Sequence, residues 1–144
     1  MKRNLIGILS LMVLSVLISS TGAFAQSYAK ADVPFAFAVG SAQLPAGTYE
    51  IKTVGASNSS IVIQNSETSA AAMSTAGREQ PRNVSAKLVF HHVGNTYFLA
   101  EVWRSSSAEG MIVPTSNQEK ELTKELRAAN WDSGGYEEVV VALN

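Results

Sequence analysis

The stretch Lys87-Leu-Val-Phe-His-His-Val-Gly-Asn-Thr-Tyr-Phe-Leu-Ala-Glu-Val-Trp-Arg104 holds two β-rich runs on either side of Gly94-Asn95. Glycine and asparagine adopt positive φ at low energetic cost, so this dipeptide predicts a two-residue turn between antiparallel strands. The turn sets the register of the hairpin, in which Val89 is expected to face Ala100. Both faces of this ribbon are mostly apolar, so we expect each face to be covered by another layer of the protein.

Side chains alternate between the two faces of a strand, which assigns the residues of the hairpin to two sets. The first set is Val89, His91, Val93, Phe98, Ala100 and Val102, and the second is Leu88, Phe90, His92, Tyr97, Leu99 and Trp103. Glu101 is expected on the face of His92, several residues along the ladder. The two adjacent histidines therefore point in opposite directions, and we expect no shared metal ion between them.

The first 25 residues have the three parts of a secretion signal. Lys2 and Arg3 form a short positive region, Leu5–Ile18 is apolar, and Ala23-Phe24-Ala25 matches a cleavage site. The apolar run is shorter than the ~18 residues of a membrane-spanning helix. We expect residues 1–25 to be a signal peptide, residues 26–144 to be a single β-rich domain, and the protein to be exported, either periplasmic or secreted.

Composition narrows the classes of partner and site. The chain has no cysteine, which excludes disulfides, thiolate metal sites and a lipidated cysteine. After cleavage the formal charge is −3, and the basic residues are scattered along the sequence. Nucleic-acid binding depends on clustered cations, so we expect no nucleic-acid partner. Because the chain has no cysteine to carry a lipid, we also expect no stable membrane anchor after cleavage.

Further strands are predicted from alternation and β-branched content at 31–39, 48–54, 60–64, 69–76, 111–113 and 136–143. Pro34 belongs near a strand start or an edge because it cannot donate to a ladder. Val139–Leu143 is apolar on both faces, which predicts a strand buried inside the sheet.

Ser116-Asn-Gln-Glu119 is a capping box, which predicts a helix from there to about Ala129. Leu122 and Leu126 form an apolar stripe on this helix, suited to cover one face of the hairpin. The expected fold class is all-β, a mostly antiparallel barrel or sandwich of about seven or eight strands with one C-terminal helix.

Two segments carry a resemblance. The opening Val33-Pro-Phe-Ala-Phe-Ala-Val-Gly40 with Leu44-Pro-Ala-Gly-Thr-Tyr49, and the later Phe98-Leu-Ala-Glu-Val-Trp103 with Glu119-Lys-Glu-Leu122, resemble a family of short exported proteins from soil bacteria. The resemblance covers nearly the whole chain after residue 25. Its motifs are structural, and it implies no activity and no functional residue.

No set of residues predicts catalysis. Glu119, Glu121 and Glu125 are interpreted as the start and the solvent face of the helix, and no serine lies in a Gly-x-Ser-x-Gly elbow. We expect no catalytic residue, no metal site and no cofactor. The aromatic residues are expected to fill the core, although they can also line a barrel cavity.

The leading hypothesis is an exported, non-catalytic domain that binds a protein or cell-envelope partner. The alternative is a carrier of a small apolar ligand, and an enzyme of unknown class comes third. The candidate ligand or partner surface consists of His92, Tyr97, Glu101, Trp103, Trp131 and Tyr136. Trp131 and Tyr136 flank Gly134-Gly135, where exposed aromatic rings can form a platform for a sugar or a partner.

Overall fold

The computed structural model describes residues 29–55, 59–79, 85–104, 110–129 and 135–144. The strands are β1 (Ala29–Val33), β2 (Phe37–Val39), β3 (Ala42–Leu44), β4 (Gly47–Val54), β5 (Ser60–Asn65), β6 (Ala71–Thr75), β7 (Gly77–Glu79), β8 (Lys87–Val93), β9 (Thr96–Trp103), β10 (Gly110–Ile112) and β11 (Glu137–Ala142), and the helix is α2 (Asn117–Ala128). The expected signal peptide lies outside these residues. Among them, no helix combines the length and the hydropathy that a membrane crossing requires.

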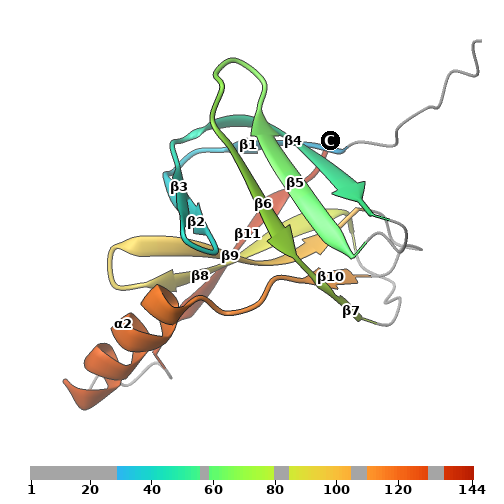
Figure 1. Ribbon diagram of the computed structural model, residues 1–144. Coiled ribbons are helices and arrows are strands. Elements are labelled where there is room, and N and C mark those ends of the chain that lie inside the picture. Colours follow the sequence, from blue (N-terminus) through green and yellow to red (C-terminus); the bar gives the residue numbers. More distant parts are fainter. Residues whose placement is uncertain (1–28, 56–58, 80–84, 105–109, 130–134) are drawn as a thin grey trace, which may run out of the picture.

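The strands form two sheets around one core (Figure 1). One sheet has the order β1-β4-β5-β6, and the other has the order β11-β8-β9-β10-β7, with β2 and β3 joined to it through a parallel β2–β9 pair. Ala76 alone separates β6 from β7, so the chain crosses between the sheets there. At the opposite edges β1 contacts β11, and the Asn144 amide donates to the Lys30 carbonyl at 2.9 Å. The all-β, mostly antiparallel fold with one C-terminal helix is confirmed.

The expected strand over residues 31–39 is divided in two. β1 pairs with β4 in one sheet, and β2 pairs with β3 and β9 in the other. The break falls at Pro34, which has no N–H to continue a ladder. This division, together with the three-residue strands β7 and β10, gives eleven strands in the described part of the chain.

β8 and β9 form the expected hairpin. His92 lies opposite Tyr97 and Phe90 lies opposite Leu99, as the turn at Gly94-Asn95 predicts. Gly94 has φ of 62°, the positive value that made glycine suitable for this turn. The register near the turn is therefore confirmed.

Farther from the turn, a β-bulge changes the expected register. Val89 lies opposite Glu101, not Ala100, because the irregularity between Val89 and Phe90 adds one residue to β9. The extra residue exchanges the faces of the residues that follow it. Val102 belongs to the barrel core, whereas Trp103 points to the other face, and the same shift removes Glu101 from the face of His92.

Both faces of the ribbon are covered, as expected. The inner face joins a continuous core that both sheets share; its most buried members are Ala31, Val33, Phe37, Val39, Tyr49, Ile51, Ile61, Ile63, Leu88, Phe90 and Val102. On the outer face, Val93 and Phe98 are buried together with Ala38, and Leu122 and Leu126 of α2 pack over them. The helix is thus the second layer that the apolar outer face requires.

The expectation that the last strand lies inside the sheet is wrong. β11 is the edge strand of its sheet, and among the described strands it is paired only with β8. Its inner residues Val139 and Val141 pack against the core, but the Val140 side chain, on the outer face, is 55% exposed. α2 covers the turn end of the ribbon and does not reach Val140, which stays exposed to solvent. Hydropathy alone does not reveal how far along the sheet the helix extends.

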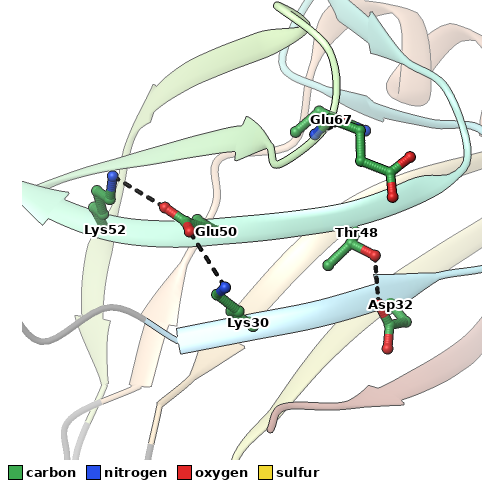
Figure 2. Close-up of polar contacts among 7 residues, drawn as sticks. Lys30, Asp32, Thr48, Glu50, Lys52 and Glu67 are labelled. Carbon is green, nitrogen blue, oxygen red and sulfur yellow. Dashed lines mark hydrogen bonds and ion pairs between the residues drawn. The ribbon is translucent and has the colours of Figure 1, made fainter.

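The outer face of β1 and β4 carries a small ionic network (Figure 2). The Glu50 carboxylate lies 3.2 Å from the Lys52 ammonium and 3.5 Å from the Lys30 ammonium. The hydrogen bond from Lys52, and then the positive charges of Lys52 and Lys30, lower the pKa of Glu50. Exposed pairs of this kind add little stability, and the network marks a solvated face of the barrel.

Asn65 organises the turn between β5 and β6. Its buried Oδ1 accepts from the amides of Glu67 and Thr68, each at 2.9 Å. We expect Asn65→Ala to lower the free energy of unfolding by about 1–3 kcal/mol, because two amides lose their acceptor. Urea unfolding measures the loss, and Gln64→Ala, at the exposed neighbour, is the control expected to change little. A loss at Gln64 equal to that at Asn65 contradicts this account.

Candidate functional site

The residues that come together most closely lie where α2 passes over β8 and the start of β11. The helix begins after Pro114, and the Ser116 hydroxyl accepts from the Glu119 amide at 3.1 Å, as the capping box predicts. The cap fixes the first turn of α2, which aims residue 119 at the barrel. The position of the helix therefore sets the position of the site.

Glu119 is not on the solvent face of the helix, contrary to expectation. Its side chain is 7% exposed, and its Oε1 lies 2.6 Å from Nδ1 of His91 on β8. The carboxylate is also favoured by its place in the first turn of a helix, where the backbone amides present partial positive charge. A charged side chain tolerates this burial because it has a hydrogen-bond partner.

Tyr136 stacks on His91, the other member of the pair with Glu119. The rings of His91 and Tyr136 are 4.0 Å apart between centroids and 25° from parallel. Tyr136 comes just before β11 and keeps a partly exposed ring. Carboxylate, imidazole and phenol thus follow one another from α2 across β8 to the start of β11.

One side of α2 adds three cations to this row. Lys120, Thr123, Lys124 and Arg127 are spaced by three, one and three residues, which places them on a single side of the helix. With His91, Glu119, Tyr136 and Thr115 they line an open groove of about 380 Å³, which we call the basic groove. Within the described residues, no ion pair joins the ammonium group of Lys120 or Lys124 to an acid.

Gly135 allows the start of β11 to lie against the helix. Its φ is 101°, and a Cβ there would lie 2.6 Å from Cγ2 of Thr123 and 3.0 Å from Nε of Arg127. No larger residue fits this position without moving the helix side chains. Gly135 thus brings Tyr136 close to α2.

A second open groove adjoins the first at Thr115, which lines both. It has a volume of about 370 Å³ and is lined by hydroxyls, amides and small residues: Gly40, Ser41, Ser74, Thr75, Pro114, Thr115, Ser116, Asn117 and Gln118. We call it the hydroxyl groove. It carries no ionisable side chain, in contrast to the basic groove.

The five described residues of the predicted surface lie in different places. His92 stacks on Tyr97 with centroids 4.2 Å apart, and Tyr97 stacks on Phe35 at 3.9 Å. This stack belongs to the inner face of the ribbon, opposite to the basic groove. His92 also lies 3.8 Å from the carboxylate of Glu137, an exposed residue of β11.

Glu101 and Trp103 form a separate pair. The Trp103 indole donates to the Glu101 carboxylate at 2.8 Å, and its ring is 2% exposed. A ring so deeply buried is part of the packing rather than of a surface. Trp131 lies outside the described residues. Of the members of the predicted set that the structure describes, only Tyr136 lines the basic groove.

Comparison with known proteins finds no relative. Neither the protein families, nor the curated proteins, nor the solved structures contain a match to this chain. The geometry of the two grooves is therefore the basis on which a function can be inferred.

Sequence reasoning missed the cations of α2 because it judged the basic residues along the chain and not around the helix. Their positions at i, i+4 and i+7 of a predicted helix were a usable signal. The partner of Glu119 had no such signal, since His91 lies 28 residues away in sequence. Among the described residues, no three His, Cys, Asp or Glu side chains are grouped to hold a metal ion.

Proposed function

We propose that the protein is an exported, non-catalytic binding domain, and that the basic groove holds an acidic group of its partner. The partner is a protein or a component of the cell envelope. The observation that carries the proposal is the placement of Lys120, Lys124 and Arg127 along one open groove, beside the stacked ring of Tyr136.

The free energy of binding in such a groove comes from the positive charges of its lysines and from the fixed positions of its side chains. Lys120 and Lys124 form no ion pair with a described residue, so both remain available to attract an external carboxylate or phosphate. The rigid elements on both sides, α2 and β8, hold the groove in one shape, which lowers the ordering cost of binding. The packing of the interior favours a binding surface over the carrier of an apolar ligand, because aromatic rings of the core contact one another edge to face.

The test uses hexaglutamate as the acidic probe and calorimetry as the measurement. We expect the double variant Lys120→Gln/Lys124→Gln to bind the probe about tenfold more weakly than the wild type, which corresponds to the loss of roughly 1.4 kcal/mol. Added salt is expected to weaken the wild-type binding and to reduce the difference between the two proteins.

The matched control is Lys30→Gln/Lys52→Gln, which removes the same charge from the solvated face of β1 and β4. It is expected to leave the affinity for hexaglutamate unchanged. Equal weakening in both double variants would show that only net charge matters, and it would contradict the proposal. Native mass spectrometry of the protein from its host's envelope tests the carrier alternative, since a co-purified apolar small molecule would support that alternative instead.

A further inference from the structure

Resting on the proposed function, we propose that the two grooves together bind an oligosaccharide in which an acidic sugar alternates with a neutral one. The acidic unit, a uronic acid, lies in the basic groove, and the neutral unit lies in the hydroxyl groove. Three observations separate this class from an acidic peptide: Nε2 of His91, which has no partner among the described residues, the lining of the hydroxyl groove, and the exposed ring of Tyr136.

The hydrogen bond between His91 and Glu119 fixes what the imidazole can offer. A carboxylate accepts hydrogen bonds, so Nδ1 of His91 carries the hydrogen that points at Glu119. Nε2 of the same ring has no hydrogen-bond partner among the described residues. A sugar hydroxyl both donates and accepts, so it can pair with this nitrogen whether or not the nitrogen carries a hydrogen, whereas the ionised side chain of a glutamate can only accept.

The hydroxyl groove needs a neutral unit with many hydrogen-bonding groups. Ser41, Ser74, Thr75, Asn117 and Gln118 line it, and Thr115 connects it to the basic groove. Hydroxyl and amide groups both donate and accept, as sugar hydroxyls and acetamido groups do. A second anionic unit would find no cation there, because no lysine or arginine is part of this lining.

Tyr136 adds an apolar surface at the edge of the basic groove. One face of its ring is stacked on His91, and 37% of the residue is exposed. A tyrosine with an apolar ring and a polar hydroxyl suits a sugar, whose ring has C–H bonds on its faces and hydroxyls at its rim. Each groove has a volume near the lower end of the ~300–1,000 Å³ of ligand pockets, which fits a single sugar unit in each.

The experiment compares four probes by calorimetry on the whole protein. The first is a hyaluronan tetrasaccharide, in which glucuronic acid alternates with N-acetylglucosamine. The second is tetragalacturonate, in which every unit is acidic, and the third is chitotetraose, in which every unit is neutral. The fourth is hexaglutamate. We expect the alternating tetrasaccharide to bind at least about tenfold more tightly than each of the other three.

Two double variants locate the binding. Lys120→Gln/Lys124→Gln is expected to weaken the binding of the alternating tetrasaccharide and of hexaglutamate alike. Asn117→Ala/Gln118→Ala changes two exposed side chains and is expected to weaken the alternating tetrasaccharide by about tenfold while leaving hexaglutamate unchanged. Circular dichroism verifies that both variants are folded.

The outcomes separate this inference from the proposed function. Equal affinities for the alternating tetrasaccharide and hexaglutamate, with no effect of Asn117→Ala/Gln118→Ala, overturn the saccharide and leave the acidic-partner proposal standing. Equal or tighter binding of tetragalacturonate or chitotetraose overturns the alternation of an acidic and a neutral unit. If no acidic probe binds in a manner that depends on Lys120 and Lys124, both proposals fail.

Discussion

Phe90→Ala is expected to lower the free energy of unfolding by about 3–5 kcal/mol, the largest loss at a single position of this barrel. The Phe90 side chain is fully buried, opposite Leu99 in the hairpin. Its ring meets those of Phe35 and Phe37 edge to face, each with centroids 5.2 Å apart. Removing the ring loses its transfer free energy, leaves a cavity and removes two favourable aromatic contacts.

Urea unfolding of the purified protein measures this loss as a shift of the midpoint at an unchanged slope. Phe35→Ala is the matched control because it removes the same atoms from a ring that is only partly buried. The control is expected to cost less, since its site can collapse or admit water. Equal losses at the two positions would show that Phe90 is not at the centre of the core.

Gly110→Ala is expected to destabilise the protein by about 1–3 kcal/mol, although it adds a single methyl group. Gly110 lies against the Trp103 ring, and a Cβ there would be 2.5 Å from Cζ2 and 2.6 Å from Cζ3. The ring is buried, and its hydrogen bond to Glu101 fixes its orientation. Neither the ring nor the backbone of β10 can move away without losing existing contacts.

Gly77→Ala is the control for this substitution. Gly77 lies in β7, opposite Ile112 of β10, and a Cβ there has 3.9 Å to its nearest neighbour. This change is expected to be close to neutral. In the background of Trp103→Leu, which shortens the obstructing side chain, Gly110→Ala is expected to cost much less than in the wild type. A cost that is the same in both backgrounds would assign the effect to the backbone of β10 instead of the ring.

The parts of the fold that depend on neighbours in sequence were predictable. The hairpin followed from Gly94-Asn95 between two β-rich runs, and the helix followed from the capping box at Ser116. The cover of Leu122 and Leu126 over the hairpin followed as well, because an apolar stripe and an apolar face both need burial. These inferences used local turn chemistry and periodicity alone.

The parts that depend on distant neighbours were not predictable in this way. The bulge in β9 has no signature, since Leu99-Ala-Glu-Val102 reads as uninterrupted strand, yet it decides the faces of Val102 and Trp103. The edge position of β11 was hidden by its apolar composition. The burial of Glu119 depends on His91, and only packing of the helix on β8 brings the two together.

The hydrogen bond between Asn144 and Lys30 joins the two ends of the described chain. The Lys30 carbonyl, at the free edge of β1, thus depends on a residue from the other end of the described chain for its hydrogen bond. Sheet contacts of such long range are slow to form. We therefore expect the contact between β1 and β11 to be among the last parts of the fold to form.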